Sequence, residues 1–362
     1  MSVNRRRESL PENKVPTQAH KGDKYHNMKT IVKPLILLSL ILLMAACQEK
    51  EPFYKSKLNI KPEPVDLEFD RYEEVLFNLD TADFQNELMK IQDRYRVFLG
   101  GDLSDPEAVS YLKDFAIDPF SIHLYNKVKE CFPDLKQVEP VVEDVMAHFH
   151  YYYPNVPLPS KVFTCVTGVT ADVPAVQVFD DVMVISLDWY LGNDEMYDQI
   201  GMPKYMALRR NVSSLAKDVA KELYMNYIYQ WRKQGQVVDE MVYNGEVDFF
   251  IEAMCPTVHD SVLLGYSSKQ WQWAVENEGA VWADIVGGHR LYDSSLDSYM
   301  MFFGDGPFTQ AYSNDAPSRL GEFFGLNVIR AYASNNDFDL PQLMQRTDLQ
   351  GVFQESGYKP KK

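Results

Sequence analysis

One short stretch of the chain has the spacing of a metal-peptidase signature. The residues "KELYM" place Lys221, Glu222 and Met225 where the motif HExxH has its first histidine, its glutamate and its second histidine. In that motif the two histidines hold Zn²⁺ and the glutamate activates the bound water. A protonated lysine repels a dication, and a thioether is a poor ligand for Zn²⁺. We therefore interpret these three residues as a degenerate site, with an ordinary surface or salt-bridged helical glutamate as the simpler alternative.

Other residue types that could do chemistry give weaker signals. His148 and His150 are the one histidine cluster, but residues two apart on a helix point in different directions, which favours one buried and one exposed imidazole. The chain has no GxSxG elbow for a nucleophilic serine, and no GxxxxGK[ST] or GxGxxG loop for phosphates. The sequence therefore predicts no catalytic residue, no bound metal and no cofactor.

One tract concentrates aromatic side chains beside carboxylates. It reads "GYSSKQWQWAVENEGAVW" and covers residues 265–282. Packing of a core helix explains such a tract, and a groove for a partner or ligand is the functional alternative. The candidate groove consists of Trp271, Trp273, Glu276, Glu278, Trp282 and Arg319.

Hydrophobic periodicity places these residues on helices around a small sheet. Strands are expected at the start of 65–80 and at 161–170 and 175–191, the latter two paired antiparallel around "ADVP", with a turn at Asp180-Asp181. Helices are expected at 81–97, 105–116, 120–131, 135–152, 203–232, 237–254, 268–285, 317–335 and 340–346. The predicted fold class is α+β, mostly α: a helical domain with a small central antiparallel sheet.

The first part of the chain looks like a lipoprotein leader. The apolar run from Leu35 to Ala46 is too short to cross a bilayer as a helix, and it ends in small residues directly before Cys47. This pattern is similar to a bacterial lipobox, which predicts that Cys47 carries the lipid anchor. We expect an upstream segment of artefactual or disordered character at 1–27, a signal peptide at 28–46, a tether at 47–64 and one domain at 65–360.

The charge balance and the cysteines exclude several classes of protein. The formal net charge is −16, and such an acidic surface repels nucleic acid, which is bound through clustered lysines and arginines. Membrane attachment must then come from the acyl chains. Beyond Cys47, the widely spaced Cys131, Cys165 and Cys255 do not form a disulfide framework, and buried thiols are the expected outcome.

Several tracts in a fixed order behind the lipobox resemble the GldB family of gliding-motility-associated lipoproteins of the Bacteroidota. They are "DLEFDRYEEVLFNLD", "ISLDWYLGND", "GYSSKQWQWAVENE", "LYDSS", "PSRLGEFFGLNVIRAY" and "SGYKP". The resemblance implies a non-catalytic, periplasm-facing envelope lipoprotein, with the outer membrane favoured over the inner. It also implies protein partners in a complex linked to gliding and secretion, and a fold distantly similar to degenerate zincin peptidases.

Two other functions remain open at this stage. One is a zincin-like metal-dependent peptidase with Glu222 as general base and remote ligands such as Glu246 or Glu252. The other is an envelope-glycan-binding module that uses the aromatic residues between Trp271 and Trp282.

Overall fold

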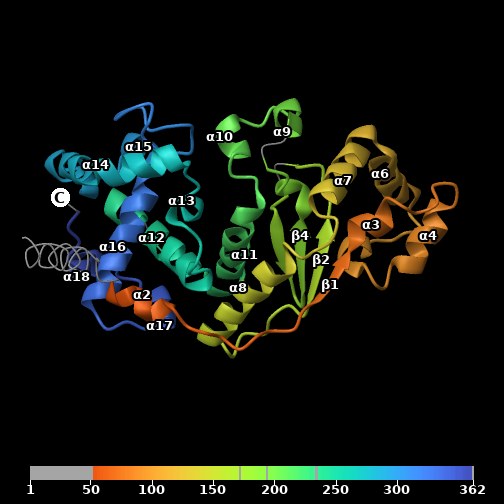
Figure 1. Ribbon diagram of the computed structural model, residues 1–362, viewed down its shortest axis with the longest axis horizontal. Coiled ribbons are helices and arrows are strands. Elements are labelled where there is room, and N and C mark those ends of the chain that lie inside the picture. Colours follow the sequence, from red (N-terminus) through yellow and green to blue (C-terminus); the bar gives the residue numbers. More distant parts are fainter. Residues whose placement is uncertain (1–51, 171–172, 193–194, 233–234, 361–362) are drawn as a thin grey trace, which may run out of the picture. The chain divides into compact units, whose positions relative to one another are not determined.

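The computed structural model describes residues 52–170, 173–192, 195–232 and 235–360 (Figure 1). The predicted upstream segment, the signal peptide, Cys47 and the tether up to residue 51 lie outside these residues. The described residues belong to one unit that begins at Pro52. Among them, no helix combines the length and the apolar character that crossing a bilayer requires.

A four-stranded mixed sheet lies within the described part of the chain. Its strands are β1 (Glu68–Arg71), β2 (Lys161–Cys165), β3 (Val176–Phe179) and β4 (Val182–Ser186), in the order β1-β2-β4-β3. The β1–β2 and β2–β4 pairs are parallel, and β3 runs antiparallel to β4 at the edge. The predicted antiparallel pairing of 161–170 with 175–191 is therefore wrong, because β2 runs parallel to β4, and the antiparallel pair is β3 with β4.

The Asp180-Asp181 turn explains this pairing. A two-residue loop can join antiparallel neighbours only, so β3 and β4 form a hairpin within the segment predicted as one strand. Asp180 has a φ of 46°, a left-handed conformation that aspartate tolerates better than most residues. The turn was predicted from the sequence and is confirmed.

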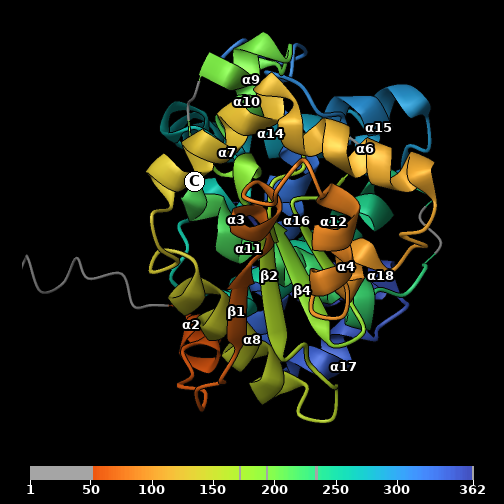
Figure 2. The ribbon, with the colours of Figure 1, turned by 90° about the vertical axis from the view of Figure 1, so that its right-hand side faces the viewer.

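Helices cover both faces of the sheet, because successive side chains of each strand point to opposite faces. Phe163 and Val184 pack against a first group of helices, which is in front of the sheet in Figure 2. Val162 and Met183 point to the opposite face and belong to the main core. The first group comprises α3 (Tyr72–Leu76), α4 (Phe84–Ile91), α5 (Arg96–Leu99) and α6 (Pro106–Ile117). The chain continues into α7 (Pro119–Cys131) and α8 (Glu139–Tyr152), which contribute buried residues to the main core on the other side of the sheet.

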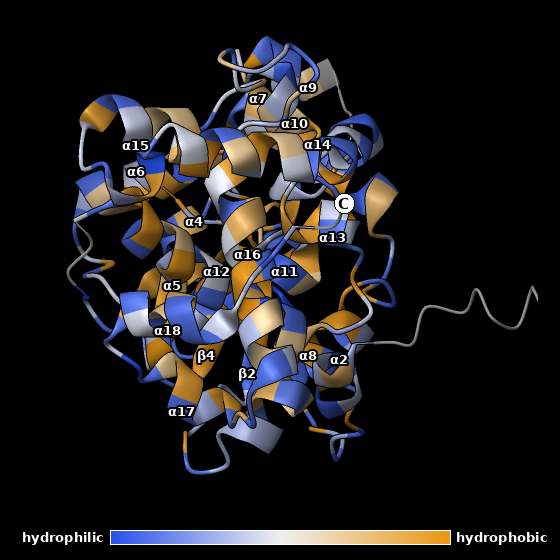
Figure 3. Ribbon diagram, turned by 90° about the vertical axis from the view of Figure 1, so that its left-hand side faces the viewer, coloured by the Kyte–Doolittle hydropathy of each residue, from blue (hydrophilic) through white to orange (hydrophobic). Residues whose placement is uncertain are grey.

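The larger helical part contains the main core, where Figure 3 shows hydrophobic residues gathered along α11 (Leu215–Leu223), α12 (Val237–Met254) and α16 (Leu320–Asn335). The helices α12 and α16 come so close that a Cβ atom on Gly245 would overlap the backbone of Gly325. The other helices are α9 (Glu195–Gln199), α10 (Lys204–Ala207), α13 (Asp260–Leu263), α14 (Ser268–Gly287), α15 (Leu296–Phe303), α17 (Leu340–Met344) and α18 (Leu349–Ser356).

The long helix predicted at 203–232 is broken into shorter elements. Asn211 has an extended backbone, and its side chain accepts a hydrogen bond from the Ser213 N–H, so α10 cannot continue into α11. After α11 the helix widens into a π-helical turn at Tyr224–Ile228. The predicted helix at 237–254 has the same bounds as α12, whereas α15 and α18 were not predicted.

The folded unit starts earlier than the expected boundary at residue 65. Residues Phe53–Leu58 form α2, which buries Tyr54 and Leu58 against the main core. Lys57 forms an ion pair with Asp337, just beyond α16. Part of the segment expected to be a tether is therefore packed against the domain. Tyr54 and Leu58 are four residues apart, so they lie on the same face of α2 and can be buried together.

Candidate functional site

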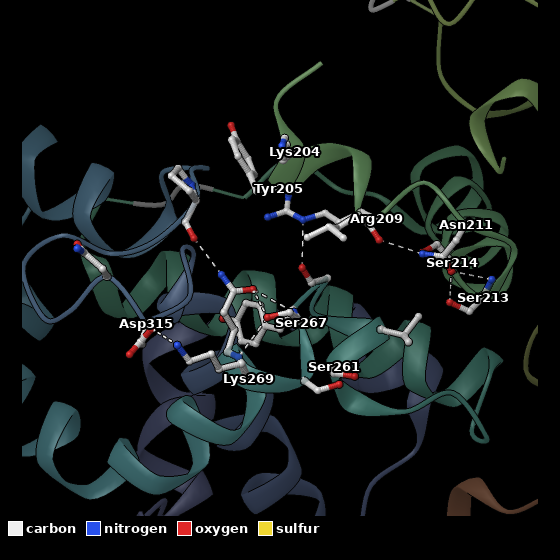
Figure 4. A pocket seen from close by; sticks show the side chains of 18 residues that line it. Lys204, Tyr205, Arg209, Asn211, Ser213, Ser214, Ser261, Ser267, Lys269 and Asp315 are labelled. Atoms are coloured by element: carbon white, nitrogen blue, oxygen red, sulfur yellow. Dashed lines mark hydrogen bonds and ion pairs between the residues drawn. The ribbon is translucent and has the colours of Figure 1, made fainter. Parts of the chain in front are cut away.

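A polar cleft with a volume of about 670 Å³ opens between α10, the start of α11, the α13–α14 connection and the loop after α15. Figure 4 shows Lys204, Tyr205 and Arg209 on one wall, with Ser267 and Lys269 facing them and Asp315 beside Lys269. Three basic side chains and one carboxylate line it, together with many hydroxyl groups. The hydroxyl-bearing residues are Tyr205, Ser213, Ser214, Ser261, Tyr266, Ser267 and Ser268.

One wall is built by the consecutive residues "GYSSKQ" at 265–270. Ser267 and Gln270 form a capping box, in which Ser267 Oγ accepts from the Gln270 N–H and the Gln270 side chain accepts from the Ser267 N–H. This box starts the 20-residue helix α14 at the cleft. The positive end of the α14 helix dipole therefore adds to the basic character of the wall.

Two arginines meet beneath this wall. A Cβ atom on Gly265, whose φ is +66°, would lie 3.1–3.2 Å from atoms of both Arg209 and Arg319, so only glycine lets the guanidinium groups come this close. Arg209 Nη1 donates to Asp305 at 3.0 Å, and Arg319 Nε lies 3.4 Å from the same carboxylate. Burial and the nearby Arg319 lower the pKa of Arg209.

Arg319 itself is held in an unusual conformation. Its φ of 57° is in the left-handed region at the residue that precedes α16. Arg319 Nη1 donates to Glu322 at 2.7 Å, Nη2 donates to the Leu264 carbonyl at 2.7 Å, and its own carbonyl accepts from the Tyr266 hydroxyl. Backbone strain of this kind persists where surrounding contacts fix it, and it is frequent at functional sites.

A buried ionic layer continues from Arg319 toward the core. Burial, followed by the neighbouring Glu322, raises the pKa of Asp248 to about 7. Burial and the nearby Arg319 lower the pKa of Lys217. In the part of the chain that the structure describes, Asp248 Oδ2 has no hydrogen-bond partner. Charges of both signs thus lie under the cleft and fix the position of the arginine pair.

The predicted degenerate site has a structural use in this fold. Glu222 Oε1 accepts from the backbone N–H of Val178 at 3.0 Å and from Asn226 Nδ2 at 2.7 Å. Lys221 and Met225 are exposed. A π-helical turn begins at Tyr224, so Met225 does not lie in the same regular α-helix as Lys221. Over the described ranges, no group of three or more His, Cys, Asp or Glu side chains is arranged to hold a metal ion.

The carboxylates named as remote ligands are occupied by arginines. Glu246 is fully buried and paired with Arg232, and Arg330 Nε donates to Glu252 at 2.8 Å. The two histidines follow the expectation for a helix, with His148 buried and His150 exposed. Cys165 and Cys255 are the expected buried thiols.

The aromatic tract mostly packs inward along α14. The Trp271 ring contacts Phe323 at a centroid distance of 5.9 Å, and Trp282 packs against Phe324, Phe353 and Tyr358. Trp273 is half-buried against the main core. Because Trp271 and Trp282 are separated by roughly 16 Å of helix, the structure does not bring the tryptophans together.

The other members of the predicted groove are also dispersed. Glu276 is exposed and accepts from Gln272, whereas Glu278 is buried and accepts from the Tyr358 hydroxyl at 2.6 Å. Arg319 alone lies at the polar cleft, beneath Gly265. The sequence analysis selected the tract 265–282 for its tryptophans. The residues of this tract that line the cleft are its first six, 265–270.

Sequence reasoning missed Lys204, Arg209 and Asp305. The helix predicted at 268–285 starts at the same residue as α14, but the positive end of this helix was not recognised as part of a site. Nothing local indicates that residues 204–209 lie opposite that helix start, because this proximity is a tertiary one.

Comparison with known families agrees with the tracts noted in the sequence. The family model described as gliding motility protein GldB matches residues 54–360. This range runs from the second residue of α2 to the last described residue, so it includes the cleft and both helical groups. No curated protein and no solved structure matches the chain.

Proposed function

The chain belongs to the GldB family of gliding-motility lipoproteins, and from this premise we propose that it is a non-catalytic envelope component that binds a partner protein in its polar cleft. In this proposal Cys47 carries the lipid anchor, and the domain faces the periplasm. The observation that carries the proposal is the placement of the cleft relative to α2, the first described helix of the chain.

The helix α2 and the cleft are toward opposite ends of the domain. In Figures 1 and 2, α2 lies at the lower end of the domain, whereas α10 lies at the upper end. The contacts of α2 explain its position, since Tyr54 packs against Phe249 and Lys57 pairs with Asp337. A chain that leaves the domain at α2 therefore leaves it on the side away from the cleft.

A lipid on Cys47 would fix the direction in which the cleft opens. Only residues 48–52 separate Cys47 from α2, and so short a segment reaches at most roughly 20 Å even when extended. The end of the domain with α2 then faces the membrane, and the cleft faces away from it. This geometry suits a protein that offers a binding surface to a partner in the periplasm.

The use of the conspicuous carboxylates supports a binding role over a catalytic one. Glu222 is engaged by Val178 and Asn226, and Glu246 and Glu252 are paired with arginines. A general base must instead be within hydrogen-bond reach of the water or substrate that it deprotonates. The cleft instead offers basic and hydroxyl groups, which can bind a ligand through ion pairs and hydrogen bonds.

Site-specific photo-crosslinking in the native host tests the proposal. Replacing Tyr205, at the cleft, by p-benzoylphenylalanine should give a discrete protein adduct in the membrane fraction. Replacing Tyr111, which is 75% exposed on α6, provides the matched control and should give none. Equal adducts from both positions, or adducts from Tyr111 alone, would show that the cleft is not the partner's site.

A further inference from the structure

We infer that the cleft recognises an acidic peptide segment, so that the partner presents aspartate or glutamate side chains to it. This inference names the chemistry of the partner and rests on the proposed function.

The charge of the cleft is opposite to that of the chain. The whole sequence has a net charge of −16, yet Lys204, Arg209 and Lys269 line the cleft against the single carboxylate of Asp315. A basic concavity on an acidic protein attracts anionic groups and repels further copies of the same acidic chain. Charge complementarity therefore selects a negatively charged partner.

Hydrogen-bond donors remain open on the walls of the cleft. Arg209 uses Nε for the Gly265 carbonyl and Nη1 for Asp305, and its Nη2 group donates to no described residue. Among the described residues, Lys204 likewise has no ion-pair partner. Lys269 holds Asp315 at 2.6 Å in an exposed pair, which an incoming carboxylate can replace at little cost.

The arginine position is set before a ligand arrives. Asp305 and the Gly265 carbonyl fix the guanidinium of Arg209, and the adjacent Arg319 repels it from below. A second anion beside Arg209 would relieve this repulsion between like charges. Because the donor is already oriented, binding a carboxylate loses little side-chain entropy.

The aromatic side chains of the cleft favour a peptide over a sugar. The ring of Tyr205 is covered by the Arg209 guanidinium, 5.4 Å from the ring centroid, and Tyr266 is buried. Arg209 occupies one face of the Tyr205 ring and the Tyr266 ring is buried, which leaves little aromatic surface for a sugar to stack on. Leu208 is 58% exposed at the edge of the cleft and suits an apolar side chain next to the acidic ones.

The test is the binding of fluorescein-labelled hexaglutamate to the purified full chain in detergent, followed by fluorescence anisotropy. We expect saturable binding that weakens with salt and that hexaglutamine does not reproduce. The double substitution Lys204→Gln and Lys269→Gln should raise the Kd by roughly fivefold, because two charge-assisted contacts to the ligand are lost.

The matched control removes two exposed lysines outside the cleft, through Lys90→Gln and Lys136→Gln. These lysines are paired with Glu87 and Asp134, as Lys269 is with Asp315. The Kd of the control should stay within about twofold of the wild-type value. Thermal unfolding of both variants establishes that each is folded before its Kd is compared.

Three results would overturn the inference: no saturable binding of hexaglutamate, equal weakening by both double substitutions, or tighter binding of an oligoglucuronate than of hexaglutamate. The last result would assign the cleft to an acidic glycan instead. A failure here is distinguishable from a failure of the proposed function, because an adduct at Tyr205 with no hexaglutamate binding rejects the acidic peptide but keeps the partner site.

Discussion

The carboxylate of Glu222 accepts a hydrogen bond from the backbone N–H of Val178, at 3.0 Å. Val178 lies on β3, the edge strand of the sheet, and its N–H points away from β4 toward α11. An edge strand exposes unpaired backbone groups that invite pairing with other chains. Glu222 therefore caps the edge of the sheet, a structural role for the one residue that matches the catalytic position of HExxH.

This role predicts how Glu222 variants behave. The substitution Glu222→Gln keeps an acceptor oxygen and should leave the free energy of unfolding within about 0.5 kcal/mol of the wild-type value. The substitution Glu222→Ala should cost about 1–2 kcal/mol, because the Val178 N–H loses its acceptor and Asn226 keeps only the backbone carbonyl of residue 222. Urea unfolding measures both differences, and an alanine variant as stable as the glutamine variant would refute the capping role.

The same variants test the peptidase alternative. We expect elemental analysis of the purified chain to find no stoichiometric zinc, in the wild type or in Glu222→Gln. A tightly held zinc ion that is lost on substitution of Glu222 would instead support a metal-dependent peptidase.

The close approach of α12 and α16 should not tolerate a side chain at the contact. In Gly245→Ala the new methyl group would overlap the Gly325 backbone, so the helices must move apart, at a cost of about 3 kcal/mol. Gly287→Ala is the matched control, since nothing lies within 4 Å of its added Cβ atom at the end of α14. Its effect should be within about 1 kcal/mol and on the stabilising side. Similar losses in both variants would contradict the packing argument.

Asp248 should make the domain less stable as the pH rises. Its pKa is raised from 3.8 to about 7 in the folded chain, so the folded state binds the proton more tightly than the unfolded state does. The stability that this proton supplies is present below the unfolded pKa and is lost as the pH rises through the folded one. Asp248→Asn removes this titration. Its stability relative to the wild type should therefore increase by about 2–3 kcal/mol between about pH 5 and about pH 8.

Urea unfolding of the wild type and Asp248→Asn across this pH range provides the measurement. Glu246 also has a raised pKa, but it titrates in both proteins, so the difference between them isolates Asp248. A difference that is independent of pH would show that Asp248 is charged throughout.

The predicted lipid anchor can be tested independently of the cleft. Cys47→Ala should move the chain from the membrane fraction to the soluble fraction of host cells, because a chain with net charge −16 gains little from anionic lipid headgroups. Cys255→Ala is a control for loss of a thiol. Unchanged membrane association of Cys47→Ala in detergent-free buffer would contradict the anchor.

The sequence predicted elements whose local signals agree with their tertiary environment. The helix at 237–254 is apolar over most of its length, and a Gln236–Asp239 capping box starts it, so its bounds were found correctly. The 203–232 segment has helical periodicity throughout, but Asn211 adopts an extended conformation and pairs with Leu191 across a β-bridge. That contact is a tertiary one, and no pattern within the segment reveals it.

The candidate site was harder to predict than the fold. Its walls come from residues 204–214, 261–270 and 307–315, which are brought together only by the packing of α11, α13 and α14. The tryptophans drew attention to α14, yet aromatic side chains on a helix usually pack inward, as Trp271 and Trp282 do here in half-buried positions. A single lysine or arginine carries no signal by itself in a chain with 36 of them.

The most direct test of the account combines the crosslink with the charge substitutions. The yield of the adduct from p-benzoylphenylalanine at position 205 should be measured in native membranes in three backgrounds: unsubstituted, Lys204→Gln with Lys269→Gln, and Lys90→Gln with Lys136→Gln. We predict that the adduct is abundant in the first and third backgrounds and falls severalfold in the second. An adduct of equal yield in all three, or none in the unsubstituted chain, would contradict a partner held through the basic cleft.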